Sequence, residues 1–348
     1  MAFALSALLF LFLPDLRPAA TAVSPAVRTA SHGEVASDAL CRVSLEPLDR
    51  RPGDVVPVSA ACDAGLVEFR ASLGESAVPF FTLDGAAPDA AADGRPAAWP
   101  EDAARNAGAA AAATSLGALV GLDLRATPGA RDLVWEARFA DGARASGAHV
   151  IEVTSRSFPV QRLRLPRRMV TPDPETLSRI AREALQLASV LSAVSPERLW
   201  RGPFTAPVPE ARGGGFGARR VLNGRAAEPH TGMDLRATTG TPVQASNGGV
   251  VALVDTLYYG GKTVVLDHGL GLFTSYSHLS QVSVMEGDSL AGGQLLGRVG
   301  ATGRVTGPHL HWAVVLNGAR VDPVSLIAAT SGLTLEPADV RPAGSATE

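Results

Sequence analysis

The sequence of 348 residues is poor in cysteine, in lysine and in long apolar runs. It has two cysteines, and neither lies near the histidine-rich part of the chain, which argues against a cysteine-ligated metal site or a cysteine nucleophile. The only lysine, Lys262, does not follow the Gly213-Gly214-Gly215 run, so we expect this run to be a flexible entry to a domain and not a phosphate-binding loop. The net charge of −3 gives no argument for nucleic acid or an anionic membrane surface as a partner.

The chain begins with a short apolar run over residues 2–13, followed by small residues at 19–22. This is typical of a secretory signal, and the run is too short for a membrane span, which needs about 20 residues. No lysine or arginine precedes the run, so an uncleaved membrane anchor is the alternative. We predict a signal peptide over residues 1–22 and an exported protein, periplasmic or extracellular. There, Cys41 and Cys62 would form a disulfide contributing about 3 kcal/mol, with two buried thiols as the alternative.

Residues 41–158 contain short strand-like runs separated by turn residues, without helical periodicity. We predict an immunoglobulin-like β-sandwich here, preceded by a linker over residues 23–40. A segment rich in alanine, aspartate, proline and glycine, residues 85–113, is expected to be an insertion. Nothing in this region has catalytic spacing, so its expected role is positioning or contact with protein partners. The predicted strands cover residues 55–58, 66–73, 77–83, 132–139 and 148–153, with a hairpin turn at 140–142.

A linking helix is predicted over residues 172–195. Asp173 suits its cap, Pro174 its first position and Glu175 its positive N-terminal end. Its apolar residues recur at steps of three and four, so they form one stripe that we expect to pack on a flanking domain. Residues 200–330 are glycine-rich and predicted to form a compact antiparallel sheet domain, followed by a disordered tail over 331–348. The expected strands cover residues 249–254, 262–267, 273–277, 294–299 and 311–316.

Five of the seven histidines lie between residues 230 and 311. His309 and His311 are two apart, a spacing that puts both side chains on the same face of a strand. His230 and Asp234 would reach one ion from a loop that runs into a strand. Histidine and aspartate are zinc ligands, and three protein ligands with water in the fourth position form a hydrolytic zinc site. The chain as a whole is therefore predicted to be mainly β and to be a secreted zinc hydrolase.

Between residues 216 and 326 the chain carries a series of short motifs. They are Arg220-Val221-Leu222-Asn223-Gly224, His230-Thr231-Gly232-Met233-Asp234, Gly240-Thr241-Pro242-Val243, Leu266-Asp267-His268-Gly269, Tyr276-Ser277-His278-Leu279, Glu286-Gly287-Asp288, Val299-Gly300-Ala301-Thr302-Gly303, Gly307-Pro308-His309-Leu310-His311 and Val321-Asp322-Pro323. Their order and spacing resemble the lysostaphin-type (LytM-like) zinc metallopeptidases, which cut the peptide part of bacterial peptidoglycan. Residues 158–163 and the capped helix resemble exported members with an amino-terminal β domain.

The resemblance implies a role for each histidine of the cluster except His268, which would be structural. His230, Asp234 and His311 would bind one zinc ion per chain. His278 and His309 would be the catalytic pair, with His309 preferred as general base and the other stabilising the oxyanion or protonating the leaving amine. The division of these roles within the pair stays open.

Asn223 and Tyr276 match positions that contact substrate in the family, so the resemblance implies substrate contacts for both. Tyr276 and His278 are also two apart and are expected to share a face of their strand. Departures from the family pattern are small: Val305 stands where a serine is common, and Trp312-Ala313 replace the commoner Phe-Glu. No ligand or catalytic histidine is lost.

The resemblance thus implies a zinc-dependent endopeptidase that hydrolyses peptide bonds of peptidoglycan cross-links, with no nucleic-acid partner. Whether a D,D cross-link or a glycine-rich bridge is cut stays open. The alternative is a non-enzymatic regulator of cell-wall amidases with the same fold. Such relatives lack one or more of the metal or histidine residues, and this chain retains all five.

Overall fold

The structure is a computed structural model that describes residues 40–45, 50–83, 113–166, 170–209 and 211–332. The predicted signal peptide, nearly all of the linker and of the 85–113 insertion, and most of the tail lie outside these residues. Within the described residues, no helix is long and apolar enough to cross a membrane.

The amino-terminal domain consists of two four-stranded sheets, ordered β1–β2–β6–β5 and β4–β3–β7–β8. Side chains from both sheets share one buried apolar cluster, which includes Val58, Ala118 and Trp135, so the sheets pack face to face. This confirms the predicted sandwich. Its strands are β1 (Cys41–Leu45), β2 (Val55–Cys62), β3 (Leu66–Leu73), β4 (Ser76–Ala77), β5 (Phe81–Thr82), β6 (Thr114–Gly121), β7 (Gly129–Phe139) and β8 (Arg144–Val153).

Alternating side chains account for the packing of β7, where Leu133, Trp135 and Ala137 are buried and the residues between them are exposed. The predicted hairpin joins β7 to β8, and its Gly142 has φ of 88°, a left-handed conformation that glycine adopts readily. Cys41 lies opposite Cys62 on β1 and β2, and the two form the predicted disulfide.

The predicted linking helix is α2 (Pro174–Ser192). Asp173 caps it, because its side chain accepts a hydrogen bond of 2.8 Å from the Thr176 backbone N–H. The apolar stripe of α2 packs on the carboxy-terminal domain, as expected for a helix flanking a sheet. The contacting side chains are Leu187, Val190 and Leu191 on the helix and Leu253, Val265 and Phe273 on the sheet.

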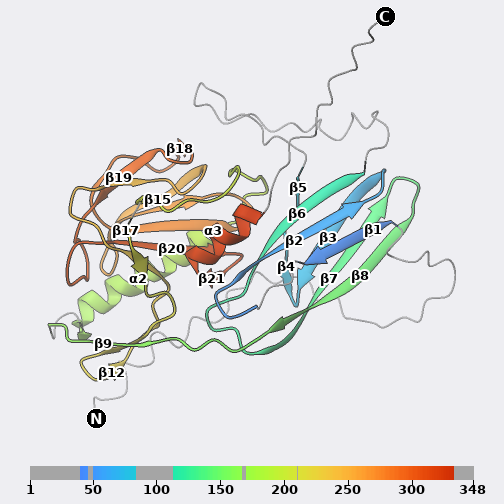
Figure 1. The fold of residues 1–348 in the computed structure, drawn as a ribbon. Helices are drawn as coiled ribbons and strands as arrows, with labels where there is room; N and C mark the ends of the chain where they lie inside the picture. Colours follow the sequence, from blue (N-terminus) through green and yellow to red (C-terminus); the bar gives the residue numbers. More distant parts are fainter. Residues whose placement is uncertain (1–39, 46–49, 84–112, 167–169, 210, 333–348) are drawn as a thin grey trace, which may run out of the picture. The chain divides into compact units, whose positions relative to one another are not determined.

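The carboxy-terminal domain contains a ten-stranded sheet, in which all the pairings of described strands are antiparallel. Its main order is β10–β13–β20–β17–β16–β15–β18, with β20 beside β17 in the middle (Figure 1). The predicted strands of this domain all appear. The strands are β10 (Gly213–Gly214), β13 (Gly232–Leu235), β14 (Pro242–Gln244), β15 (Gly249–Leu257), β16 (Gly261–Asp267), β17 (Leu272–Val282), β18 (Ser289–Leu290), β19 (Leu295–Val299), β20 (Leu310–Leu316) and β21 (Ala319–Val321).

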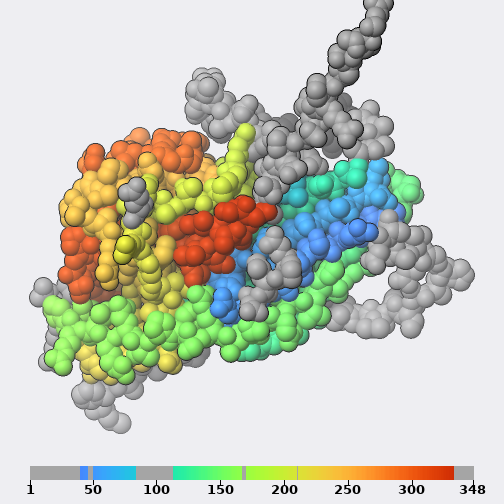
Figure 2. All heavy atoms as spheres, in the orientation of Figure 1, coloured from blue at the N-terminus to red at the C-terminus, as the bar shows by residue number. Residues whose placement is uncertain are grey.

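Two smaller features complete this domain. Helix α3 (Pro323–Gly332) packs Leu326 and Ala329 into the domain core and is visible at the molecular surface, in red in Figure 2. A three-stranded sheet joins β9 (Val160–Leu163), β11 (Arg219–Leu222) and β12 (Arg225–Ala226), with β9 parallel to β11. The chain that leaves the sandwich is therefore hydrogen-bonded to β11, which is separated from the first predicted metal ligand, His230, by β12 and a short loop.

Candidate metal centre and active site

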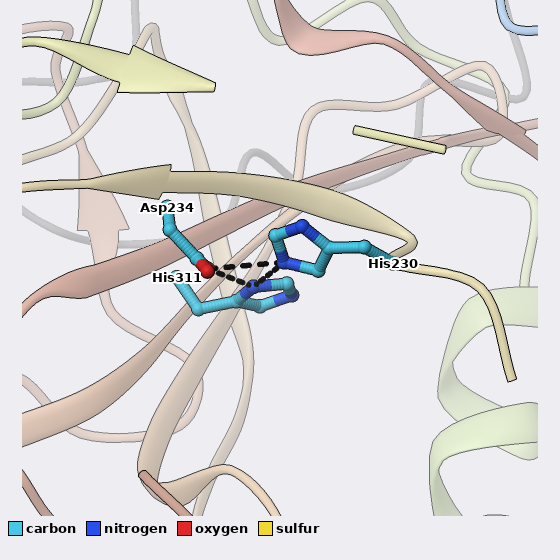
Figure 3. Close-up of side chains that lie close together, drawn as sticks. All are labelled: His230, Asp234 and His311. Carbon is cyan, nitrogen blue, oxygen red and sulfur yellow. Dashed lines mark hydrogen bonds and ion pairs between the residues drawn. The ribbon is translucent and has the colours of Figure 1, made fainter. Parts of the chain in front are cut away.

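Three side chains converge on one point at the end of the β13–β20 pair, as Figure 3 shows. His230 Nε2 lies 2.9 Å from His311 Nδ1 and 3.0 Å from Asp234 Oδ1. His311 Nδ1 lies 3.0 Å from the same Asp234 oxygen. The structure thus brings together the three residues predicted to bind zinc.

Strand register positions two of these side chains. Asp234 on β13 pairs directly with His311 on β20, and His311 pairs with Ser277 on β17, so the three form one row across the sheet. Residues that face each other across antiparallel strands point to the same side. The adjacent row, Met233, Trp312 and Tyr276, points the other way into the core.

Two glycines allow His230 to reach the point of convergence. Gly215 has φ of 94°, and its carbonyl accepts a hydrogen bond of 2.8 Å from His230 Nδ1. A side chain at Gly232 would collide with the Trp312 carbonyl, 2.6 Å from an ideal Cβ, and with the His311 ring at 2.8 Å. The Gly213–Gly215 run is therefore not a flexible entry: Gly213 and Gly214 form β10 and Gly215 orients His230. The expectation of flexibility was wrong because the run is hydrogen-bonded to the ligand strand.

The donor set fits a zinc ion. Because the Gly215 carbonyl is only an acceptor, neutral His230 carries its proton on Nδ1 and directs the Nε2 lone pair at the other two side chains. Nitrogen and oxygen ligands about 2.0–2.1 Å from a tetrahedral zinc ion lie about 3.3 Å from one another. The observed separations of 2.9 to 3.0 Å are close to this edge length.

The predicted catalytic histidines flank the three ligands. His309 Nε2 lies 3.6 Å from Asp234 Oδ1, and the His278 and His309 rings are 4.8 Å apart between centroids. His309 Nδ1 donates to the Gly307 carbonyl and His278 Nδ1 to the Thr302 carbonyl, each at 2.9 Å. When neutral, both rings therefore present an unprotonated Nε2 that is able to accept a proton.

His278 reaches the site through an irregularity in β17. Its φ is 67°, an uncommon conformation for a residue with a side chain, and the pairing register of β17 with β16 shifts across it, between Tyr276 and Leu279. The prediction that Tyr276 and His278 share a strand face was wrong, because this bulge interrupts the alternation. Tyr276 is fully buried, while His278 lines the site.

Burial and neighbouring groups set the charges in the site. Burial alone would raise the pKa of Asp234, but hydrogen bonds and charge interactions with His230 and His311 outweigh it and hold this pKa well below its ordinary value. Burial lowers the pKa of His278 to about 3, and the nearby His311 and His309 act in the same direction. Asp234 is therefore ionised and His278 neutral at pH 7.

Both predicted substrate contacts have other partners. The Tyr276 hydroxyl lies in the core, where it contacts Thr274 Oγ1 at 2.8 Å and Ser246 Oγ at 3.0 Å. A phenol with no exposed surface does not reach a substrate, so this prediction was wrong. Asn223 is exposed, but its amide accepts from the Leu165 N–H at 2.9 Å and donates to the Leu165 carbonyl at 2.8 Å. Both ends of its amide hold the segment after β9 in place.

His268 has the structural role expected of it. It is fully buried, its Nδ1 donates to the Gly248 carbonyl at 2.6 Å, and its Nε2 lies 2.7 Å from Thr274 Oγ1. Burial lowers its pKa to about 4. Neither ring nitrogen is available to a metal or a substrate.

Sequence reasoning missed Arg220 as a site residue, although it stands in one of the matching motifs. Its Nη2 lies 3.8 Å from Asp234 Oδ2, the carboxylate oxygen that faces away from the three-residue cluster. Its Nε is buried and has no hydrogen-bond partner among the described residues. Burial lowers the pKa of Arg220, an effect that Asp234 opposes and Arg304 reinforces. The sequence motif contains Arg220, but its approach to Asp234 on β13 becomes visible only in the folded structure.

Comparison with known proteins agrees with this geometry. Residues 228–323 match Peptidase family M23. The DD-carboxypeptidase/endopeptidase Mpg of Neisseria meningitidis is 46% identical over 105 residues, which are 30% of this chain and 24% of Mpg. The peptidoglycan DD-endopeptidase ShyA of Vibrio cholerae is 44% identical over 94 residues, which are 27% of this chain and 22% of ShyA. The matched region thus spans less than a quarter of either relative's length.

A solved structure extends the similarity beyond this region. A crystal structure of a Pseudomonas aeruginosa protein assigned to peptidase M23 aligns with a TM-score of 0.54 and 28% identity. The alignment covers 80% of this chain and 95% of the other. Motif order, sheet topology and these matches lead to one conclusion: the chain carries, over residues 228–323, a domain that matches peptidase family M23.

Proposed function

We propose that this protein is a zinc-dependent endopeptidase that hydrolyses peptide bonds in the cross-links of bacterial peptidoglycan. The observation that carries the proposal is the convergence of His230, Asp234 and His311 on one point, with the rings of His278 and His309 beside it. Relatives named peptidoglycan DD-endopeptidases support this class of substrate.

His230, Asp234 and His311 would hold the zinc ion, and none of them has a better alternative role in the structure. Once bound, zinc would supply a Lewis acid and lower the pKa of a coordinated water to about 7. The carboxylate of Asp234 balances part of the positive charge.

His309 and His278 would manage the protons of the reaction. The Nε2 of His309 lies 3.6 Å from Asp234 Oδ1, and the Gly307 carbonyl occupies Nδ1, so neutral His309 would accept a proton from the attacking water at Nε2 as general base. It would then return that proton to the leaving amine. Neutral His278 also offers an acceptor at Nε2, and it would become a donor to the oxyanion only after gaining a proton. Backbone carbonyls at Gly307 and Thr302 fix the orientation of both rings.

An exported location fits this function, since peptidoglycan lies outside the cytoplasmic membrane. We propose that residues 1–22 direct export to the periplasm or the exterior, either as a cleaved signal or as an anchor. The Cys41–Cys62 disulfide supports the same proposal, because structural disulfides persist mainly in oxidising compartments.

Digestion of purified sacculi with the zinc-loaded full-length protein, followed by mass analysis of the fragments, tests the proposal. We expect cleavage of peptide cross-links that disappears when zinc is chelated. His309→Ala should retain zinc, measured by elemental analysis, and lose about 10²- to 10⁴-fold in rate, the usual contribution of a general base. His149→Ala, on the sandwich strand β8, is the matched control and should change neither.

The opposite result is equally specific. Zinc-loaded wild-type protein that leaves sacculi intact but stimulates a cell-wall amidase would contradict the proposal and favour the regulator. Unchanged cleavage by His309→Ala would contradict the assignment of the base.

A further inference from the structure

Among the described residues, Arg220 is the arginine that forms an ion pair with a predicted metal ligand, and the proposed reaction does not use it. It lies on β11 beside the ligand strand, with about a quarter of its side chain exposed. Its ion pair to Asp234 Oδ2, at 3.8 Å, is too long for a strong hydrogen bond. Its buried Nε has no partner within the described part of the chain.

Burying part of a charged guanidinium in this way is costly. A buried donor without a partner typically costs about 1–3 kcal/mol, and more when the group is charged. An arginine presents its donors as a planar fork that matches a carboxylate or phosphate. About a quarter of the Arg220 side chain is exposed and its Nη2 lies beside Asp234, so the guanidinium is suited to an anionic group of the substrate.

The surrounding charges favour an anion. Arg304 stands close enough to Arg220 for its charge to act on it, and the Arg304 guanidinium lies 4.1 Å from the centre of the Tyr259 ring. Asp234 is the acidic side chain that acts on Arg220, and its Oδ1 is directed at the two ligand histidines. With a zinc ion bound, Arg220, Arg304 and the metal would together carry more positive charge than Asp234 neutralises. A substrate group with a negative charge would balance the remainder.

Peptide chemistry identifies the anion. The scissile amide itself is neutral, and so is a bridge made only of glycine. A cross-link that ends on the amino group of an amino acid differs, because that residue's own carboxyl group remains free one carbon from the scissile nitrogen. A carboxylate in this position would enter the active site whenever the amide does.

We propose that Arg220 binds a free carboxylate on the amine side of the scissile bond, so that the site selects cross-links whose amine-side residue ends in a carboxyl group. The proposal rests on the proposed function and names the bond that this function would act on. It favours a D,D cross-link over a glycine-rich bridge.

Binding measurements separate this proposal from hydrolysis. The probes are N-acetyl-D-Ala-D-Ala as the free acid and the same peptide as its carboxy-terminal amide, which differ only in the carboxylate. Calorimetric titration of zinc-loaded, full-length His309→Ala protein avoids turnover. We expect the free acid to bind about 10- to 100-fold more tightly than the amide, the range of a hydrogen bond to a charged group. Adding Arg220→Gln should abolish the difference, whereas Arg220→Lys should restore part of it.

Arg219→Gln is the matched control. It changes the preceding residue of β11, whose side chain is exposed, and it should leave the preference intact. Zinc content is measured for every variant. Equal affinity for both probes in the His309→Ala protein would overturn the proposal. So would a preference that persists in Arg220→Gln, since the metal would then hold the carboxylate, or loss of zinc in that variant, which would make Arg220 a positioning residue for Asp234. Failure to cleave sacculi would contradict the proposed function and leave this binding result to be judged separately.

Discussion

The two domains differ sharply in what they bury. In the described part of the sandwich, the buried cluster consists of apolar side chains and the disulfide. Every buried polar or charged residue of the described chain lies at or after His230, in the carboxy-terminal domain. Burial of a polar group is unfavourable unless the group is hydrogen-bonded, so each buried polar residue of this domain needs a partner. The buried polar residues of the described chain, which include the candidate metal ligand His230, are thus confined to the carboxy-terminal domain.

The buried polar residues of the carboxy-terminal domain also fall into two kinds. His268, Thr274 and Tyr276 form a buried hydrogen-bonded chain whose two ends reach the Gly248 carbonyl and Ser246. His230 and His311, by contrast, bring nitrogen atoms within 2.9 Å of each other beside a carboxylate, an arrangement that an ion stabilises better than protons do. The hydrogen-bonded residues around His268 support the fold, whereas His230, Asp234 and His311 form the candidate metal centre.

The largest effect is expected from Asp234→Asn, which keeps the shape of the side chain and removes its charge. Zinc content should fall, and cleavage of sacculi should drop by more than about 100-fold, since even the outer partners of metal ligands typically contribute 10- to 100-fold. Asp63→Asn, at an exposed position of the sandwich, should change neither quantity. Full activity of Asp234→Asn would contradict the assignment of Asp234 as a metal ligand.

Trp135→Ala tests the other side of the comparison. Removing this buried ring should destabilise the sandwich by about 3–5 kcal/mol, measured by denaturant unfolding. Zinc content and cleavage per folded molecule should stay unchanged below the transition. Val134→Ala, at the exposed neighbouring position of β7, should have little effect on unfolding. A loss of zinc in Trp135→Ala would show that the two domains are not independent in function.

Replacing Cys41 and Cys62 together by serine should lower the stability of the sandwich by about 3 kcal/mol, through the loop that the disulfide closes. Unfolding of the double variant is compared with that of the wild-type protein under reducing conditions, which should match it. If reduction also abolishes cleavage at a temperature where both domains are folded, the sandwich contributes to the reaction.

His268 should make the stability of the carboxy-terminal domain depend on pH. Its pKa is about 4 in the folded protein, against an ordinary value of 6.5, so the unfolded chain binds more protons between these values. Stability is then lost as the pH falls, by roughly 2 kcal/mol between pH 7 and 5. The difference between wild type and His268→Gln in denaturant unfolding at both pH values isolates this contribution. An identical pH dependence in the two proteins would contradict it.

Much of the fold follows from local pattern. Strands such as β3 and β16 appear where hydrophobic residues and turn residues predict them, and Asp173 caps α2 as expected. Strand β6 was missed because five consecutive residues in it are buried, so it lacks the period of two that reveals a half-exposed strand. Its small residues, including Gly117 and Ala118, gave no compensating β signal.

The site was predictable where the spacing of residues within one motif fixes the direction of their side chains. His311 lies on β20 and His309 directly before it, and both reach Asp234 as their spacing predicts, whereas His278 depends on a bulge that no spacing rule reveals. Tyr276 looked equally suited to the site but belongs to the core row of β17. Arg220 was invisible as a site residue because its approach to Asp234 requires strands β11 and β13 to meet in space. Side chains that depend on tertiary contacts were the ones that sequence alone could not place.

The parallel pairing of β9 with β11 has a practical consequence for where the catalytic unit begins. The family match starts at residue 228, but β11 pairs with β9 (Val160–Leu163). In addition, the Asn223 side-chain amide forms two hydrogen bonds with the backbone of Leu165. A fragment cut just before α2 would leave β11 with an unpaired edge, which favours aggregation, and would loosen the strand that carries Arg220. The smallest autonomous catalytic fragment should therefore start ahead of Val160.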